Sequence, residues 1–320
     1  MPRDSFLTRY RRPFLTGLVF GLLVVVGVLV LSDAPAVGAA MAGFYWPLLP
    51  IILLLAPLNY ILRYVKWSYY LRLADLHPKP SMSRLIFASG LSMTVTPGKV
   101  GELLKCYLMK EHMGAPVSVT SSIVLAERVS DSISVGILAV IGAAAFAHGL
   151  YLMAFIALGL IGLVGALHNR TLAGFVQRTA TRLRGPALGA SVESFYVNTR
   201  KFLQPGPLFL AVALGVVSWG LEGLIVYLAV VGMGGDISVL ASIFAVAFSS
   251  LVGAVSTLPG GLGAAEGSII GLLILAGLSG EMAAAAALIT RFSTLWLGVL
   301  IGAAALYLAE RRLRKESNRQ

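Results

Sequence analysis

Long stretches without a single charged residue are the feature that most constrains this chain of 320 residues. Charged residues make up 12% of the chain and hydrophobic residues 58%, whereas a soluble domain has about a quarter charged residues. The uncharged stretches cover residues 14–31, 44–62, 132–147, 149–167, 205–221 and 237–265. A helix of about 20 apolar residues crosses the ~30 Å hydrocarbon layer. Only helices and closed barrels satisfy every backbone group there. The sequence therefore predicts an all-α polytopic membrane protein.

The distribution of Lys and Arg predicts how these helices cross the membrane. Of 25 basic residues, 19 fall in four segments, which are 1–13, 65–84, 169–205 and the tail after residue 308. No Lys or Arg occurs in the short segments 32–43, 146–149, 231–236 and 278–282. Cytoplasmic segments are enriched in basic residues. Both termini are therefore expected in the cytoplasm, which requires an even number of spans.

Eight transmembrane helices satisfy this requirement. They are predicted at 14–31, 47–64, 118–145, 150–168, 207–231, 237–257, 262–278 and 283–308. The first follows several arginines, as the apolar region of a signal peptide does, but it is longer than the ~7–15 residues of a cleaved signal. We interpret it as an uncleaved span of a multi-pass protein of the plasma (inner) membrane. Residues 1–320 are expected to form one integral membrane domain, with approximate halves 44–168 and 207–308 and a cytoplasmic connector 169–205.

One further apolar segment, residues 83–110, starts and ends on the side predicted to be cytoplasmic. Pro97 and Gly98 interrupt it. The part before this break is too short to cross the bilayer as a helix. Either a re-entrant hairpin or a helix lying on the membrane surface fits this pattern, and the sequence leaves both open.

The same break recurs later in the chain. The residues that mark the two breaks are Pro97, Gly98 and Gly101, then Pro259, Gly260, Gly261 and Gly263. Arg128 follows the first proline by 31 residues, and Arg291 follows the second by 32. Because the topology directs the two arginine-bearing helices in opposite directions, two inverted halves are predicted. Interrupted apolar segments at matching positions of inverted halves are typical of the central site of a transporter.

Charged residues within the apolar segments are the candidate site, because a charge at the bilayer centre costs at least about 2.5–3.5 kcal/mol. Glu127 and Arg128 lie 10 to 11 residues into a predicted helix, near the midplane, and Asp131 lies one turn further on. Free N–H groups at the helix start after the first break suit a phosphate. The candidate residues for binding a lipid headgroup are Lys99, Glu102, Lys105, Glu127, Arg128, Asp131, Glu266 and Arg291.

Structural roles are the alternative for the same charged residues. Arg128 can pair with Asp131, and Arg291 can pair with Glu266 or Glu222. The charges after the first break can belong to a solvated, amphipathic helix start. Near the end of the second predicted span, Arg63 and Trp67, with Tyr64 and Lys66 beside them, are interpreted as an interfacial anchor.

Several classes of protein are excluded by what the sequence lacks. It has no G-x-x-x-x-G-K-[ST] motif that would cradle a nucleotide phosphate. Its four histidines and one cysteine have no metal-ligand spacing. No soluble stretch is long enough to fold a catalytic domain or a nucleic-acid-binding module. The chain is therefore expected not to be an enzyme and to use no metal or other cofactor.

Four separated motifs resemble one known family. The runs TPGKVGELLKCYLM, AERVSDSISV, STLPGGLGAAEGSIIGLL and LITRFSTLWLGVLIGA are similar to the flippase-like membrane domain of bacterial lysylphosphatidylglycerol synthases (multiple peptide resistance factors) and of standalone relatives. In two-domain members a cytosolic aminoacyl-transferase domain follows. Here the chain ends about a dozen residues after the last predicted helix, so synthase activity is not expected.

The resemblance implies translocation of an anionic or phosphate-bearing lipid. The residues that match the family motifs are Pro97, Gly98, Lys99, Gly101, Glu102, Glu127, Arg128, Asp131, Pro259, Gly260, Gly261, Gly263, Glu266 and Arg291. We therefore expect a lipid translocase with membrane lipids as its partners. The alternatives are a secondary transporter of a small anion and the membrane subunit of a lipid-modifying enzyme. The lipid, the direction and energy coupling of transport, and whether the chain forms a homo-oligomer are left open.

Overall fold

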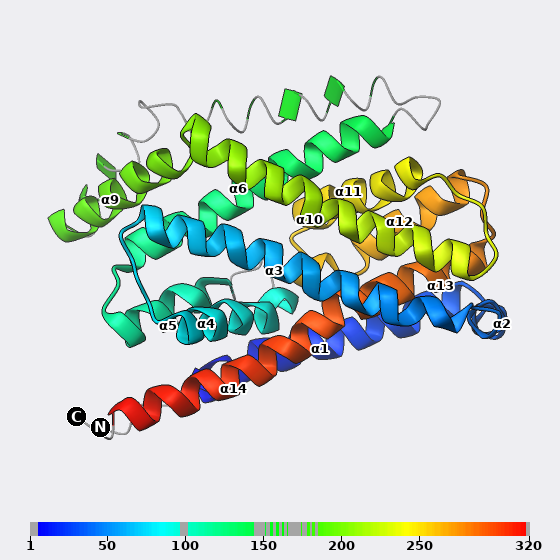
Figure 1. Cartoon of the computed structure of the whole chain (residues 1–320), viewed down its shortest axis with the longest axis horizontal. Coiled ribbons are helices and arrows are strands. Elements are labelled where there is room, and N and C mark those ends of the chain that lie inside the picture. The colour runs from blue at the N-terminus through cyan, green and yellow to red at the C-terminus, as the bar shows by residue number, and fades with distance from the viewer. Residues whose placement is uncertain are drawn as a thin grey trace.

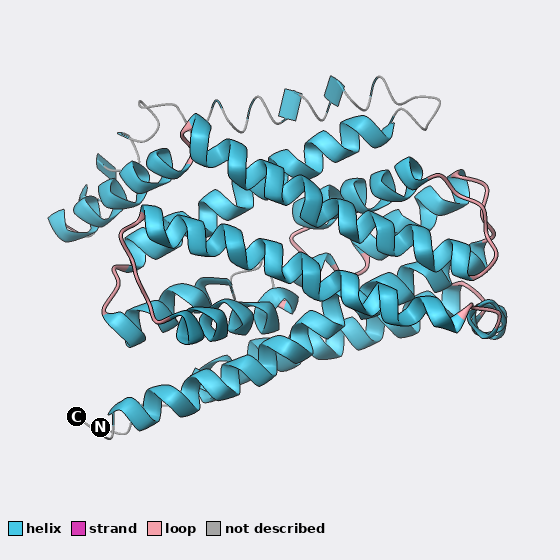
Figure 2. Ribbon diagram, in the orientation of Figure 1, coloured by secondary structure: helices cyan, strands magenta, loops and turns pink. Residues whose placement is uncertain are grey.

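The structure, a computed structural model, describes residues 6–96, 102–143 and 185–317 and scattered positions between 151 and 182. Within this part of the chain the regular structure is helical, without strands (Figure 2). The α-helices are α1 (Phe6–Leu31), α2 (Ala34–Ala42), α3 (Leu49–Leu73), α4 (Pro80–Ser92), α5 (Leu104–Met113), α6 (Val117–Ala143), α9 (Pro186–Phe202), α10 (Pro205–Gly232), α11 (Val239–Val255), α12 (Ala264–Leu275), α13 (Gly280–Arg291) and α14 (Leu297–Ser317). Short 3-10 turns are η1 (Trp46–Leu48), η2 (Met93–Val95) and η4 (Pro259–Gly261), and η5 (Phe292–Trp296) is a π-helical turn.

The expected class, an all-α membrane protein, is confirmed. Among the described residues, Trp46–Leu73, Pro205–Gly232 and Gly280–Arg312 are helical segments long and apolar enough to cross a membrane. Helices α1 and α2 form a fourth if the pair, bent by 93°, counts as one span. Helices α11 and α12 are apolar but shorter, and the predicted span 150–168 lies largely outside the described residues. The number of eight spans stays a prediction.

Local sequence signals explain where several helices begin. Pro80, Pro186 and Pro205 occupy the first helical positions of α4, α9 and α10, where a missing N–H costs nothing. Ser238 and Ser279 cap α11 and α13, because their hydroxyl oxygens accept hydrogen bonds from backbone N–H groups three residues on.

Different helix ends lie at the two ends of the bundle. Helix α1 begins and α14 ends at the same end of the molecule, where α9 also lies, and α2 lies at the opposite end (Figure 1). This arrangement agrees with an even number of crossings. Which end faces the cytoplasm stays a prediction.

Helices α4 and α5, which flank the first break, pack inside the bundle. Helix α4 packs along α14, α5 packs against α4 and α6, and the turn η2 at the end of α4 contacts η4 and α1. A Cβ atom on Gly302 of α14 would lie 2.1 Å from the backbone nitrogen of Ser92, so only glycine permits this approach. The arrangement favours the re-entrant interpretation over a helix on the membrane surface. Pro97, Gly98, Lys99 and Gly101 lie outside the described residues.

The second break is present as predicted. Gly260, Gly261 and Gly263 have φ angles of 62°, 68° and 84°, a region that glycine adopts without strain. A Cβ atom on Gly260 would lie 3.4 Å from the carbonyl oxygen of Thr94 in η2. The second break therefore touches the turn that precedes the first. The inverted symmetry of the two halves stays a prediction.

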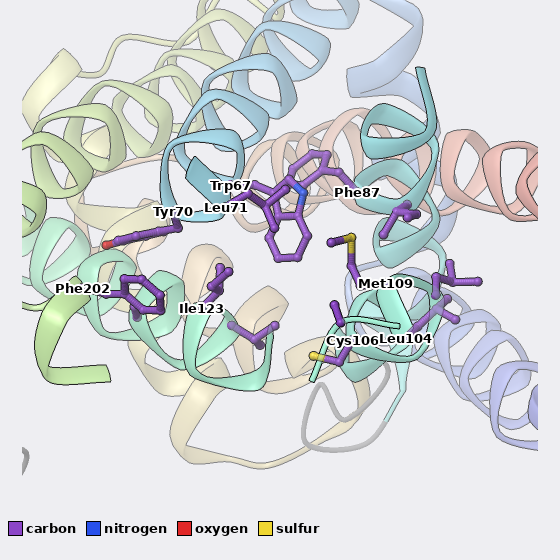
Figure 3. Packing of buried hydrophobic residues seen from close by; sticks show 14 of the residues in the cluster. Trp67, Tyr70, Leu71, Phe87, Leu104, Cys106, Met109, Ile123 and Phe202 are labelled. Atoms are coloured by element: carbon purple, nitrogen blue, oxygen red, sulfur yellow. The ribbon is translucent and has the colours of Figure 1, made fainter. Parts of the chain in front are cut away.

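The interpretation of Trp67 and Lys66 as an interfacial anchor is wrong. Both side chains are buried, at 0% and 1% exposure. Helix α3 does not end at residue 64 but continues to Leu73, and α4, α5, α6 and α9 surround this extension. Figure 3 shows Trp67 among side chains of these neighbours, including Phe87 and Met109. Packing against other helices therefore replaces the contact with the membrane interface.

Candidate functional site

A polar pocket of about 110 Å³ lies where the second break meets α3, α6, α10 and α13. We call it the central pocket. Its charged and hydroxyl-bearing lining includes Tyr60, Arg63, Glu102, Arg128, Glu222 and Arg291. The backbone of Gly260 and Gly261 forms another part of the wall. The second break and both predicted arginines thus meet at one site.

Arg128 of α6 is held by two carboxylates. Its Nε lies 3.1 Å from Oε2 of Glu102, and its Nη2 lies 3.1 Å from Oδ2 of Asp131. The second contact is the i,i+3 pair expected from the sequence. The first joins α6 to the residues that follow the first break, so this arginine fixes the hairpin of α4 and α5 to the bundle.

Arg291 of α13 has a corresponding partner. Its Nε lies 2.8 Å from Oε1 of Glu266, which was one of the two partners expected. The other oxygen, Oε2, accepts a hydrogen bond of 2.6 Å from the backbone N–H of Gly263 at the start of α12. After each break, a carboxylate therefore binds the arginine that comes next in that part of the sequence, Glu102 with Arg128 and Glu266 with Arg291.

The arginine side chains are more exposed than the acids that neutralise them. The side chains of Arg128 and Arg291 are 26% and 17% exposed, whereas those of Glu102, Asp131 and Glu266 are 4 to 7% exposed. Asp131 and Glu266 contact the arginines without lining the central pocket, whereas Glu102 and Glu222 line it. A polar ligand in the pocket would meet three arginines and two glutamates, and arginine can grip a phosphate with two parallel hydrogen bonds.

Lys105 and Glu127 form a separate buried pair. Nζ of Lys105 lies 2.5 Å from Oε2 of Glu127 and 4.5 Å from the ring centre of Trp67. Both residues line a small cavity beside the central pocket rather than the central pocket itself. The alternative of a solvated helix start is wrong for Lys105, which is 4% exposed, because α4 and α6 cover this side of α5.

Sequence analysis missed the contribution of α3 and α10. Nδ2 of Asn59 donates to Oε1 of Glu222 at 2.6 Å, and the hydroxyl of Ser218 donates to Oδ1 of Asn59 at 2.7 Å. Lys66 binds both Asp131 and the hydroxyl of Ser130. The available signal was the spacing of Asn59, Arg63 and Lys66, which places three polar residues on one face of an apolar helix.

Two larger spaces adjoin the central pocket. The α6–α11 groove, of about 560 Å³, shares Glu102, Arg128 and Trp219 with it and is otherwise lined mainly by small and apolar side chains such as Val124 and Leu251. The α1–α14 groove, of about 700 Å³, shares Arg291 with it and is almost wholly apolar. Each predicted arginine therefore stands between the polar pocket and an apolar space.

Within the described ranges, no group of three or more His, Cys, Asp and Glu side chains is placed to hold a metal ion. The acids of the site instead contact lysine and arginine.

These features define a polytopic α-helical membrane protein with a charged pocket beside a broken helical segment. The chain belongs to the family described as the lysylphosphatidylglycerol synthase TM region, which matches residues 18–302. Two archaeal relatives are UPF0104 membrane proteins. One, from Methanocaldococcus jannaschii, is 25% identical over 236 residues, which cover 70% of this chain and 96% of that protein. Another, from Methanothermobacter thermautotrophicus, is 32% identical over 116 residues, about a third of either chain (36% and 35%).

Proposed function

We propose that this protein is a lipid translocase, which moves an anionic or phosphate-bearing lipid across the membrane by passing its headgroup through the central pocket. The observation that carries the proposal is the position of Arg128 and Arg291. Each lines the central pocket, and each also lines one of the two apolar grooves. A lipid needs this combination, because its charged headgroup and its apolar tails must be accommodated side by side.

The two grooves lie toward different ends of the bundle. The α6–α11 groove includes Ser121 near the start of α6 and Phe195 of α9, at the end where α1 begins. The α1–α14 groove includes Leu29 near the end of α1 and Trp46 of η1, at the opposite end. With the predicted topology, the grooves would serve the cytoplasmic and the outer leaflet respectively. A headgroup moving from Arg128 to Arg291 would then change leaflet.

The grooves also distinguish this proposal from its main rival. A transporter of a small soluble anion needs a cationic pocket, but it needs no apolar space of several hundred Å³ beside each arginine. Burial of hydrocarbon in such spaces contributes roughly 0.8 kcal/mol for each CH₂ group in transfer from water. For a lipid that already lies in the bilayer the gain is smaller, so the grooves act by placing the tails rather than by binding strength.

Reconstitution tests the proposal. The purified protein is placed in phosphatidylcholine vesicles with a trace of fluorescent phosphatidylglycerol, and loss of fluorescence to an impermeant quencher reports transfer between leaflets. We expect faster transfer than in protein-free vesicles. Transfer no faster than in those vesicles would refute the proposal.

Two substitutions test the role of the arginines in the same assay. Arg128→Lys and Arg291→Lys retain the charge but lose the planar fork, so each is expected to fold and to lose most of the transfer. Arg72→Lys, at an exposed position of α3, is the control and should transfer at the rate of the unmodified protein. Unchanged transfer with lysine at both sites would exclude a phosphate grip.

A further inference from the structure

The central pocket contains a third arginine, Arg63. The proposed binding of the headgroup by Arg128 and Arg291 gives it no role. It lies on α3 and not on either of the helices that follow the breaks. It lines the central pocket and also the small cavity beside it. Its side chain is 17% exposed, as is that of Arg291.

On one side, Arg63 adjoins Arg128. Nη2 of Arg63 lies 3.7 Å from Oδ2 of Asp131, the same oxygen that lies 3.1 Å from Nη2 of Arg128. A single carboxylate oxygen therefore holds the two guanidinium groups next to each other. A phosphate that contacts Arg128 from the pocket would be within reach of Arg63 as well.

On the other side, α3 connects Arg63 with the region of Arg291. Tyr60 lies one turn before Arg63, and its hydroxyl donates to the carbonyl of Thr294. Thr294 lies in the π-helical turn directly after Arg291, and all of these residues line the central pocket. Arg63 thus shares the central pocket with both arginines that border the grooves, on a helix that also contacts the turn after Arg291.

Arg63 is also the more weakly engaged of the two α3 cations that contact Asp131. Lys66 binds Oδ1 of that carboxylate directly, and its side chain is only 2% exposed. The contact of Arg63 with the same group, at 3.7 Å, exceeds hydrogen-bond length. Its guanidinium carbon lies 6.0 Å from the ring centre of Trp219, a contact that can hold the group in place without using its N–H donors.

We infer that Arg63 is the transfer residue of the pocket, which takes the headgroup phosphate from Arg128 and passes it to Arg291. This inference rests on the proposed lipid translocase function. It also narrows the substrate class to lipids whose headgroup carries a phosphate ester. Such a group has at least two non-ester oxygens, so one oxygen can stay on the first arginine while the second binds Arg63, and the phosphate is never without a charged hydrogen bond.

Translocation and lipid binding are measured separately to test this role. In phosphatidylcholine vesicles with fluorescent phosphatidylglycerol, Arg63→Gln is expected to slow transfer by about tenfold or more. The substitution removes a charged contact with the phosphate at the step that limits the rate of transfer. Binding of phosphatidylglycerol to the purified protein should change much less, since Arg128 and Arg291 remain. Arg63→Lys should fold even if the glutamine variant does not, and it should also transfer the lipid more slowly than the unmodified protein.

Lys66→Gln is the matched control, because Lys66 contacts the same carboxylate but lies outside the residues that line the central pocket. It should lower the melting temperature more than Arg63→Gln does. If Arg63 only neutralised Asp131, loss of the closer partner Lys66 would slow transfer at least as much, and that order among folded variants would overturn the inference.

The two levels of the proposal fail in different ways. Transfer by Arg63→Lys at the unmodified rate would overturn the role of Arg63 and leave the translocase intact. Absence of transfer by the unmodified protein would instead remove the proposed function itself.

Discussion

At the scale of single residues, most buried charges form ion pairs. Some of these pairs could be predicted from the sequence, and others could not. The pair of Arg128 and Asp131 follows from i,i+3 spacing on one helix. The pair of Lys105 and Glu127 joins two helices, and the contact of Lys66 with Asp131 joins α3 to α6. Such contacts depend on how helices are rotated and packed, which local sequence patterns do not predict. The sequence thus identified the charged residues of α5 and α6 but assigned their partners incompletely.

The pair of Lys105 and Glu127 is predicted to stabilise the fold rather than to bind lipid. Lys105→Met would leave Glu127 buried without its ammonium partner, which costs about 3–5 kcal/mol. A large fall in the melting temperature of the purified protein is therefore expected. Adding Glu127→Leu to this variant should restore most of the stability, because an apolar pair of similar size needs no counter-charge.

An exposed ion pair supplies the control for this experiment. Lys201 and Asp75 lie 3.8 Å apart with side chains 45% and 87% exposed, and such surface pairs contribute about 0–1 kcal/mol. Lys201→Met should leave the melting temperature nearly unchanged. If Lys105→Met had an equally small effect, the buried pair would not be structural.

At the scale of helices, the extents of α6, α10 and α11 agree with the prediction within about two residues, and the extent of α3 does not. The glycines of the second break predicted a turn that the structure contains. In contrast, α3 continues to Leu73, past the predicted end at residue 64. The prediction used the charges of Arg63 and Lys66 as the membrane boundary, but both side chains contact Asp131 of α6. Burial by neighbours can therefore extend a helix through a region that its own sequence marks as an interface.

The close packing of α4 against α14 is predicted to hold the hairpin of the first break in place. Gly302→Ala would put a methyl group 2.1 Å from the backbone nitrogen of Ser92, and overpacking typically costs about 1–3 kcal/mol. Both the melting temperature and lipid transfer are expected to fall. Gly271→Ala in α12 is the matched control, because a Cβ atom there meets nothing within 4 Å. Equal stability of the two variants would show that this contact does not fix the hairpin.

At the scale of the whole molecule, the charge distribution predicted that both chain termini lie on the same side. Figure 1 shows the start of α1 and the end of α14 at the same end of the molecule. The second break, η4, contacts η2, the turn that precedes the first break, so residues about 160 positions apart lie at one site. Sequence spacing suggested this meeting through a repeat. It could not place α3 and α10 in the same site, because they carry no matching motif and enter the pocket only through packing.

The orientation of the whole molecule in the membrane is the last prediction. Since Lys and Arg concentrate on cytoplasmic segments, residue 182 should face the cytoplasm and residue 236 the opposite side. Arg182 and Asp236 are both exposed, so Arg182→Cys and Asp236→Cys should react with a maleimide. The single native cysteine, Cys106, is buried and is replaced by alanine to remove any background. In intact cells an impermeant maleimide should label only position 236, and position 182 should react only after the membrane is opened. Labelling of both positions in intact cells, or of 182 alone, would reverse or abolish the assignment of the two grooves to the two leaflets. The path from Arg128 to Arg291 would then no longer lead from the cytoplasmic leaflet to the outer one.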